Sequence, residues 1–436
     1  MASGQTARHQ PQTPIMQRSR LVGLTLAAWV VCTPLAFGDN AVLYWNEQAL
    51  DATRLSRNPP PTAALHLATF AAAIFDAVDG IVGGWHPWLV QEKAPAGTNL
   101  DAAIASAAFT VLNEVWGQET NPHNFQVAYD KALRDIPDGP PKAAGIAWGR
   151  HVAELIVAKR AEAEACLKQP LGYPASSQTP GKWRETPPGF RPPVTPAMGK
   201  VTPFVMSSPA QFRAPPPTSV DSKDYADEIA YVAKVGPRDG AERTDYETLS
   251  TPFWADDLGS STPAGHWNMI AQAIARRFTL SVPECAHLFA LLNFATADAG
   301  ISSWETKFYY LDWRPETALR EIDMKLNPHA KPEPGFIPNM PSPAHPTYTS
   351  AHSTFTGAAS RMLALCFGSD DIEFTIGSDG LPGVVRTYKR FSDACRELSM
   401  SRVWGGIHTM NDVVEGQQAG RKIADYIFAH ALLPAN

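Results

Sequence analysis

Apolar residues recur at helical spacing over most of the chain. Between residues 62 and 82, side chains such as Phe70, Ile74 and Val78 repeat at intervals of one helical turn with alanines between them, which predicts a buried helix. Similar patterns predict further helices at residues 101–115, 123–133, 142–166, 264–278, 283–310, 353–366, 393–403 and 411–430. Strand alternation is confined to residues 374–376, which we expect to form a short hairpin with residues 384–385. The pattern therefore predicts an all-α protein.

A proline-rich stretch separates two helical regions. From residue 169 to about 219 prolines occur in pairs and in one triplet, so neither a helix nor a central strand can continue there. Four of its aromatic residues predict that the segment packs against the protein and covers the entrance of a site, and a mobile linker is the alternative. They are Trp183, Phe190, Phe204 and Phe212. We expect an N-terminal helical region at 39–168, a proline-rich loop at 169–221 and a C-terminal helical region at 222–436.

Composition leaves the number of helical bundles open but argues against nucleic acid as a partner. The 436 residues, 44% of them hydrophobic, allow either one large core or two packed helical bundles. The formal net charge is −6 and the basic residues are scattered. Both features argue against a face that binds nucleic acid.

The N-terminus resembles a targeting segment. Arg18 and Arg20 precede an apolar run from Leu21 to Phe37, and a small-x-small pattern follows before Asp39. We therefore predict a signal peptide at residues 1–38, with Met16 as an alternative start, and a periplasmic or secreted mature protein. A membrane anchor is the alternative interpretation of the same run. The sequence shows no other long apolar run, so we expect no stable membrane span after the signal is removed.

The sequence does not determine whether the cysteines form disulfides or remain thiols. Four remain after the signal peptide, at positions that allow three full pairings, and buried thiols are the other interpretation. They are Cys166, Cys285, Cys366 and Cys395. The chain contains no Cys-x-x-Cys motif and no paired Cys/His spacing, which argues against a zinc site.

Three short segments in the C-terminal region bring cationic and imidazole side chains to spacings that suit one tetrahedral oxyanion. The first carries Lys307 and Arg314, the second is Ser350-Ala351-His352, and the third carries Arg402 and His408. Three permanent cations, a hydroxyl and two imidazoles offer more donors than a single phosphate contact needs, because such an ion has only four oxygens. The sequence therefore predicts a site that surrounds the whole ion.

These motifs resemble those of the superfamily shared by vanadium-dependent haloperoxidases and type 2 phosphatidic acid phosphatases. The first and third segments fit its patterns Lys-x6-Arg-Pro and Ser-Arg-x5-His, whereas Thr349-Ser350-Ala351-His352 replaces Pro-Ser-Gly-His. Ala351 retains the backbone N–H of that glycine, so oxyanion binding survives unless the backbone there needs a positive φ. A weaker likeness to bacterial haloperoxidase-like proteins begins at residues 42–46 and extends to the end of the chain. The resemblance implies a helical-bundle fold.

The resemblance implies two activities for the same residues. In a haloperoxidase that uses vanadate and hydrogen peroxide, His408 is the axial vanadium ligand, Lys307 polarises the peroxide and His352 moves protons to yield hypohalous acid. The other groups that hold the vanadate oxygens are Arg314, Ser350, the Ala351 N–H and Arg402. In an acid phosphatase, His408 instead attacks phosphorus and His352 protonates the leaving alcohol, so phosphate would occupy the same site. A third possibility is a non-catalytic oxyanion-binding protein whose departures at Thr349 and Ala351 have removed turnover.

Local spacing predicts how these residues meet. Lys307 and Arg314 are seven residues apart, about two turns, so on a helix they share one face. Pro315 biases Arg314 out of the α region, so we expect the helix to end there and the guanidinium to lie at a turn. Ser350 is expected to cap the helix that follows it, which places His352 in the first turn. Gly405-Gly406 permits a helix end between Arg402 and His408. Four residues after His408, Asp412 is expected to accept the other ring N–H and fix the tautomer.

Three further features bear on halide choice and on Arg402. Trp304, one turn before Lys307, stands where haloperoxidases of this superfamily carry an aromatic that lines the halide site, although an ordinary core role explains it equally well. His345 stands where bromoperoxidases carry histidine and chloroperoxidases phenylalanine, which favours bromide or iodide. Asp256 or Asp257 is expected either to pair with Arg402 or to act as a cap. A diffusing organic acceptor is a further expected partner.

Overall fold

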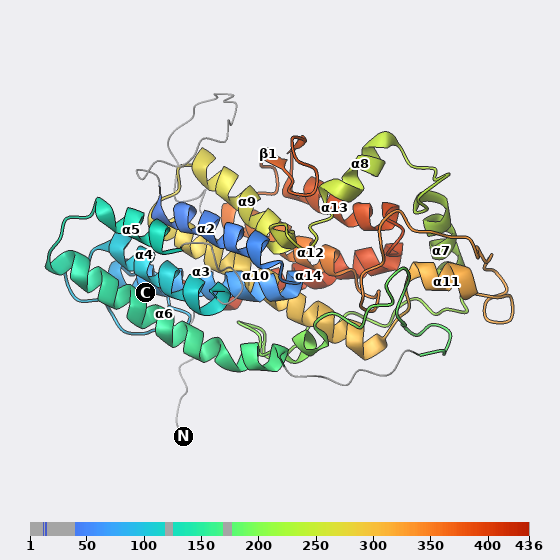
Figure 1. The fold of residues 1–436 in the computed structure, drawn as a ribbon, viewed down its shortest axis with the longest axis horizontal. Coiled ribbons are helices and arrows are strands. Elements are labelled where there is room, and N and C mark those ends of the chain that lie inside the picture. The colour runs from blue at the N-terminus through green and yellow to red at the C-terminus, as the bar shows by residue number, and fades with distance from the viewer. Residues whose placement is uncertain (1–11, 13, 15–39, 118–124, 169–176, 436) are drawn as a thin grey trace, which may run out of the picture.

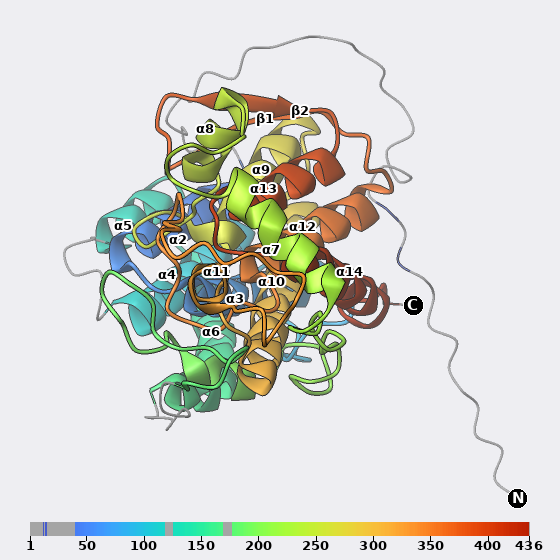
Figure 2. The same ribbon diagram turned by 90° about the vertical axis from the view of Figure 1, so that its right-hand side faces the viewer.

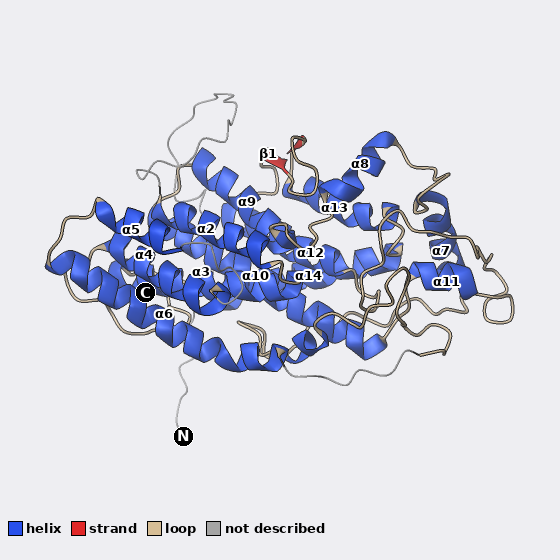
Figure 3. Ribbon diagram, viewed as in Figure 1, coloured by secondary structure: helices blue, strands red, loops and turns tan. Residues whose placement is uncertain are grey.

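The computed structural model describes residues 12, 14, 40–117, 125–168 and 177–435. The signal peptide predicted at 1–38 therefore lies outside the described residues, apart from residues 12 and 14. The described part is mainly helical, with long helices running along the length of the molecule (Figures 1 and 2). Its one sheet is a small antiparallel pair, β1 (Phe374–Gly377) with β2 (Val385–Tyr388), at the position of the predicted hairpin (Figure 3). The prediction of an all-α fold is confirmed.

All nine helices predicted from periodicity are present. In the N-terminal region these are α3 (Pro60–Val82), α4 (Leu100–Val111) with the π-helical η1 (Leu112–Trp116), α5 (Phe125–Arg134) and α6 (Pro140–Leu167). In the C-terminal region they are α9 (Thr262–Arg277), α10 (Val282–Tyr310), α12 (Ala351–Phe367), α13 (Phe391–Trp404) and α14 (Met410–His430).

Among the described residues, four α-helices were not predicted. They are α2 (Ala41–Ser56), α7 (Lys223–Val235), α8 (Asp245–Phe253) and α11 (Pro315–Glu321). α8 is a short polar helix started by the N-cap Thr244. α7, capped by Ser222, carries a stripe of buried apolar residues, including Tyr225, Ile229 and Val232, that the prediction missed. α11 is only seven residues long and too short for periodicity to reveal.

The two predicted helical regions share one hydrophobic core. The apolar helices α3 and α10 pack against each other, and their buried residues belong to the same cluster as those of α12 and α14. Examples are Phe70 on α3, Phe294 on α10 and Phe355 on α12, each almost fully buried. Each such side chain contributes roughly 1.5–3 kcal/mol on burial. The boundaries of the two regions stay a prediction.

α3 is the one helix in the described part of the chain that is long and apolar enough to cross a membrane. Of its most apolar window, 89% is buried inside the protein. In this structure the helix therefore serves as a core element.

α12 and α14 are the most closely associated helices, and their packing sets the site. Gly420 of α14 allows this approach, because a Cβ there would lie 2.2 Å from the backbone oxygen of Thr354. At the same crossing, the N–H of Ser350 donates to the backbone oxygen of Asp412 at 3.0 Å. The N-termini of α12 and α14 are thereby fixed side by side.

The proline-rich loop packs along α10, as predicted, from residue 177 onward. Trp183 and Phe204 are buried and Phe212 is half-buried, but Phe190 is 62% exposed, so its predicted burial is wrong. The loop contains the 3-10 helix η2 (Pro196–Lys200) and contacts α10 through it. Whether the loop covers an entrance stays a prediction.

The four cysteines after the signal region are all free thiols, and three of them are buried. Burial raises the pKa of Cys285 to about 12. The interpretation as buried thiols therefore holds for these three, and the alternative of disulfide pairing is wrong.

Candidate oxyanion site

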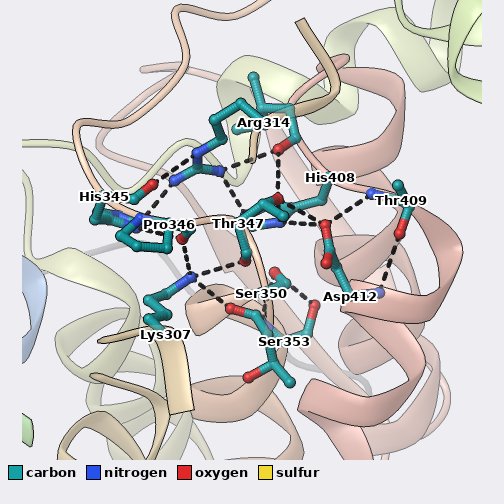
Figure 4. Close-up of polar contacts among 12 residues, drawn as sticks. Lys307, Arg314, His345, Pro346, Thr347, Ser350, Ser353, His408, Thr409 and Asp412 are labelled. Atoms are coloured by element: carbon teal, nitrogen blue, oxygen red, sulfur yellow. Dashed lines mark hydrogen bonds and ion pairs between the residues drawn. The ribbon is translucent and has the colours of Figure 1, made fainter. Parts of the chain in front are cut away.

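Lys307 lies near the C-terminal end of α10 and is completely buried. Its Nζ donates to the carbonyl oxygens of Pro346 at 2.8 Å, Thr347 at 2.8 Å and Thr349 at 2.5 Å (Figure 4). These bonds use all three N–H groups of the ammonium. In this arrangement Lys307 places its positive charge against the segment before α12, and an oxyanion would have to replace a carbonyl to bond it directly.

Arg314 reaches the same place from the other side of a turn. The helix α10 ends at Tyr310, because Leu311 adopts a left-handed φ of 56°, and Arg314 is the N-cap residue of α11. Lys307 and Arg314 therefore do not share one continuous helix face, but the prediction that Arg314 leaves the α region at a turn is confirmed by its ψ of 149°. The buried guanidinium donates from Nη1 to the backbone oxygen of Ile407 at 3.0 Å, and the same Nη1 lies 3.3 Å from Nε2 of His408.

His408 is held by Asp412 at the start of α14. Its Nδ1 lies 3.0 Å from Oδ2 of Asp412, the contact that the four-residue spacing predicts. The same oxygen accepts from the Thr347 hydroxyl at 2.7 Å and from the Thr409 N–H at 2.9 Å. Because a guanidinium only donates, the contact with Arg314 assigns the lone pair to Nε2 and the proton to Nδ1. Nε2 is therefore the ring nitrogen suited to bind a central atom.

The N-terminus of α12 provides the second segment of the site. Ser350 is its N-cap and accepts from the Ser353 N–H at 3.3 Å, as predicted. Ala351 is the first helical residue and is not among the residues with positive φ, so the missing glycine imposes no backbone strain. Nε2 of the half-buried His352 donates to the carbonyl of Ala255 at 3.0 Å. That bond leaves Nδ1 as the basic nitrogen.

Arg402 lies in the last turn of α13. The chain reverses after it at Gly406, whose φ is 75° and whose added Cβ would lie 2.4 Å from the oxygen of Gly236. Nη1 of Arg402 makes only long contacts, 3.4 Å to the oxygen of Trp254 and 3.9 Å to the sulfur of Met340. Within the described part of the chain, its buried Nε has no hydrogen-bond partner. Among the cations of the site in the described part of the chain, Arg402 is thus the one with most N–H groups available for a ligand.

Neither carboxylate predicted to pair with Arg402 forms an ion pair with it among the contacts of the described residues. Asp256 instead binds Nδ1 of buried His266 at 2.9 Å, and Asp257 accepts from the N–H of Leu258. Asp256 still lies near enough to oppose the burial that lowers the pKa of Arg402 to about 10. The prediction of a direct ion pair with Arg402 is therefore wrong, and Asp256 acts on the pKa of Arg402 only at longer range.

The cradle that these three segments form is electropositive. Burial, followed by the charge of Arg314, lowers the pKa of Lys307 well below its usual value, and burial lowers that of Arg314 to about 9. Burial and the neighbouring cations also lower the pKa of His408 and of His352 well below the usual range. The main opposing carboxylate is Asp412, whose own pKa burial raises. A bound anion would reverse these shifts, since an opposite charge favours the charged form.

Trp304 and His345 lie together beside the cradle. Their ring centroids are 5.0 Å apart, and both side chains are buried. Trp304 donates to the oxygen of Val194 in the proline-rich loop at 3.1 Å. Nδ1 of His345 lies 2.9 Å from Nη2 of Arg314, and burial followed by Lys307 lowers the pKa of this histidine well below its usual value.

Thr347 is a site residue that sequence reasoning missed. Its hydroxyl contacts both His408 Nδ1, at 3.1 Å, and Asp412, while its carbonyl accepts from Lys307. It therefore links the first and third segments. No motif marks it, and its position two residues after His345 was the only available signal.

Comparisons with known proteins find similar proteins of one group. Residues 287–435 match a family model described as the VCPO second helical-bundle domain. Vanadium chloroperoxidase of Curvularia inaequalis is 25% identical over 493 aligned residues, which cover 86% of this chain and 79% of that protein.

Solved structures of similar fold include the first bacterial vanadium-dependent iodoperoxidase, with a TM-score of 0.78, 23% identity and coverage of 93% of this chain and 99% of that one. A holo-type bacterial vanadium-dependent chloroperoxidase has a TM-score of 0.68, 18% identity and coverage of 89% and 97%. The predicted resemblance to the vanadium haloperoxidase superfamily is confirmed, and the fold is the helical bundle of that group.

The residues present fit a vanadate-like ion. Arg402 has an unpartnered buried Nε, Ser350 begins a helix whose first N–H groups lack intrahelical acceptors, and His408 has a lone pair on Nε2. Together they offer donors to the oxygens and one nitrogen to the central atom.

Proposed function

We propose that this protein is a vanadate-dependent haloperoxidase that oxidises bromide or iodide with hydrogen peroxide to hypohalous acid. Vanadate, when bound, supplies Lewis-acid activation of the peroxide. The observation that carries the proposal is the orientation of His408, whose Nδ1 is fixed by Asp412 and whose Nε2 lies beside Arg314. A histidine held in this way presents one nitrogen as a ligand.

The surrounding residues have separate tasks in this proposal. Arg402 and the N-terminus of α12 would hold the oxygens of the ion, while Arg314 and Lys307 supply positive charge from their fixed positions. Both of these cations are already bonded to backbone carbonyls, so the charge is in place before the ion binds. His352 keeps Nδ1 free to accept and return a proton because Nε2 is anchored on Ala255.

Halide selection is assigned to the pair formed by Trp304 and His345. Two adjacent aromatic rings, one of them bonded to Arg314, make a polarisable and partly positive wall beside the cradle. We propose that this wall favours the larger and more easily oxidised halides. Export to the periplasm or the medium completes the proposal and rests on the predicted signal peptide.

One paired assay tests the proposal. Protein beginning at Asp39 is stripped of bound ions, then supplied with vanadate, peroxide and a halide, with bromination of a phenol-type dye as the readout. Chloride, bromide and iodide are compared, and a chromogenic phosphate ester is tested in parallel. Halogenation that depends on vanadate and is lost in His408→Ala supports the proposal.

The other outcomes separate the alternatives. Ester hydrolysis that vanadate inhibits, without halogenation, would instead identify a phosphatase that uses His408 as nucleophile. Vanadate binding with neither activity would identify an oxyanion-binding protein. Preference for chloride would contradict the role given to His345.

A further inference from the structure

The loop between α8 and α9, residues 254–261, contributes two consecutive carbonyl groups to the site. The oxygen of Ala255 accepts from Nε2 of His352 at 3.0 Å, and that of Trp254 lies 3.4 Å from Nη1 of Arg402. The loop belongs to none of the three motif segments, and it precedes residue 287, where the match to the family model begins. Its position orients the ring of His352, because Nε2 is the nitrogen that it anchors.

Asp256, the next residue of this loop, bonds it to α9. Its Oδ1 lies 2.9 Å from Nδ1 of His266, and both side chains are only 1% exposed. Because a carboxylate accepts, Nδ1 is the donor. The backbone of Asp256 has a φ of 45°, in the left-handed region that aspartate and asparagine adopt more readily than most residues. Aspartate at this position therefore both turns the chain after Ala255 and provides the acceptor for His266.

His266 also packs on the loop through its ring. The ring centroids of His266 and Trp254 are 4.5 Å apart, with an interplanar angle of 31°. Among the described residues, neither Nε2 of His266 nor Oδ2 of Asp256 has a hydrogen-bond partner. Buried polar atoms without partners lower stability, so an apolar pair would suit the core better. The position that this pair gives the loop therefore explains it better than stability does.

α9 holds His266 in place because it is hydrogen-bonded to two neighbouring helices. The indole N–H of Trp267 donates to Oγ1 of Thr356 in α12 at 2.9 Å. The side-chain amides of Asn268 and Asn293 bond each other in both directions, at 2.8 and 3.0 Å, which connects α9 to α10. α9 and α12 lie side by side (Figure 1). His266 is therefore fixed relative to α12, the helix that carries the proton-moving histidine.

We infer that Asp256 and His266 are a positioning pair for His352. By holding the loop against α9, the pair keeps the Ala255 carbonyl on Nε2 and so keeps Nδ1 as the basic nitrogen. Without the pair the carbonyl is free to move, and the ring of His352 is free to rotate and to take either tautomer. The inference rests on the proposed function, in which His352 accepts and returns a proton at Nδ1.

The other carbonyl of the loop has an anchor of its own. The indole N–H of Trp254 donates to Oε1 of Glu397 in α13, at 3.1 Å, and the same helix carries Arg402. Loss of the pair should therefore affect His352 more than Arg402. The two effects are separable, because in the proposed function Arg402 holds the ion and His352 moves the proton.

Three variants test the inference. His266→Phe removes the hydrogen bond and keeps an aromatic ring against Trp254. Asp256→Asn is the conservative variant, since its amide oxygen can accept from Nδ1 of His266 and asparagine tolerates the left-handed φ. The double variant Asp256→Asn/His266→Phe avoids an unpaired buried carboxylate and takes the place of His266→Phe if that protein does not fold.

The matched control is His287→Phe. His287 is also buried and also stacks on a tryptophan, Trp85, with ring centroids 4.7 Å apart. It lies far from the site, because the helix from residue 287 to residue 307 spans about 30 Å. The control therefore makes the same substitution in the core without touching the loop.

The tautomer of His352 is read by NMR. Ion-free mature protein beginning at Asp39 is labelled with ¹⁵N-histidine, and the signals of His352 are assigned by comparison with His352→Gln. The ring is neutral at neutral pH, since burial, followed by the charge of Arg402, lowers its pKa well below the usual value. We expect a single tautomer with the proton on Nε2 in the wild type, Asp256→Asn and the control, and both tautomers in His266→Phe and the double variant.

Kinetics at saturating vanadate give a second readout. General acid–base catalysis contributes about 10²–10⁴-fold to a rate, and a ring that is correctly oriented only part of the time should lose some of this, so we expect kcat about tenfold lower in His266→Phe. The KM for bromide should not change. Orthovanadate affinity, measured by calorimetry, should also stay at the wild-type value, because the contacts of Arg402 and His408 are kept.

The outcomes separate positioning from a structural role. An unchanged His352 spectrum in His266→Phe overturns the inference whatever the activity, as does the same spectral change in His287→Phe or a wild-type ring with its proton on Nδ1. A changed spectrum with wild-type kcat supports the pair and refutes proton transfer by His352. Absence of vanadate-dependent halogenation in the wild type refutes the proposed function, while the spectra still test the pair.

Discussion

Replacing Asp412 with asparagine removes the group that fixes the tautomer of His408. One oxygen of Asp412, Oδ2, accepts from His408 Nδ1 at 3.0 Å, the Thr347 hydroxyl at 2.7 Å and the Thr409 N–H at 2.9 Å. An asparagine that keeps its oxygen there loses the negative charge opposite Lys307 and Arg314. One that turns its amide toward the ring donates to Nδ1 and drives the proton to Nε2, which removes the lone pair needed by a ligand.

The size of the effect follows from the place of Asp412 directly behind the ligating imidazole. Outer partners of a ligating histidine typically contribute 10–100-fold to metal affinity, or about 1.4–2.7 kcal/mol. Asp412 is buried and is also the main carboxylate facing the cations, so we expect the upper part of this range. The dissociation constant for vanadate should therefore rise by about 30- to 100-fold.

Calorimetric titration of ion-free protein with orthovanadate measures this change, and competition by inorganic phosphate provides a second value. The matched control is Asp425→Asn, an exposed carboxylate on the same helix that pairs with Arg361 at the surface. A folded Asp412→Asn protein that binds vanadate within twofold of wild type would show that His408 does not depend on Asp412. The assignment of Nε2 as the ligand atom would then have no support.

Three further changes test other parts of the structure. Ala351→Gly should keep vanadate affinity within about twofold of wild type and lower the free energy of unfolding by up to about 1 kcal/mol, since Ala351 is already helical. Severalfold tighter vanadate binding would contradict this expectation. Burial raises the pKa of Asp298 to about 6, above its unfolded value. Its contribution to the free energy of unfolding is therefore present below about pH 4 and lost as the pH rises through 6. In the wild type the free energy of unfolding should fall by an amount on the order of 3 kcal/mol between pH 4 and 7, and in Asp298→Asn this fall should be absent when urea unfolding is measured. Parallel pH dependences of the two proteins would refute the argument. Glu397→Gln leaves buried Arg386 without its counter-charge and should lower the free energy of unfolding by about 3–5 kcal/mol, whereas a change below about 1 kcal/mol would show that Ser250 and water replace it.

Periodicity located the long helices because their stability comes from an apolar face that repeats with the helical turn. α3 and α10 are the clearest cases, since nearly every turn of each contributes to the core. α7 carries a shorter stripe of buried residues, Tyr225, Ile229 and Val232, which the prediction missed although Tyr225 contacts Trp313 beside Arg314. α8, a nine-residue helix that begins with a capping box, shows no such stripe and cannot be distinguished from a polar loop by its pattern alone.

The spacing of the motifs was also informative only in part. His408 and Asp412 are four positions apart, and His408 directly precedes the N-cap Thr409 of α14, so their contact follows from local geometry. The seven-residue spacing of Lys307 and Arg314 suggested one helix face, but a left-handed Leu311 ends the helix first. The two cations still lie in one site, because the turn after α10 brings Arg314 back toward it.

The amino-acid sequence by itself determined the helical class, the identity of the cations and imidazoles, and the local pairing of His408 with Asp412. The tertiary structure alone decided that Lys307 is bonded to three carbonyls, that Thr347 joins two segments, and that Asp256 binds His266 rather than Arg402. The reason is physical. Helix formation and neighbouring contacts depend on residues within a few positions, whereas the partner of a buried charge is chosen by whatever distant backbone and side chains pack against it.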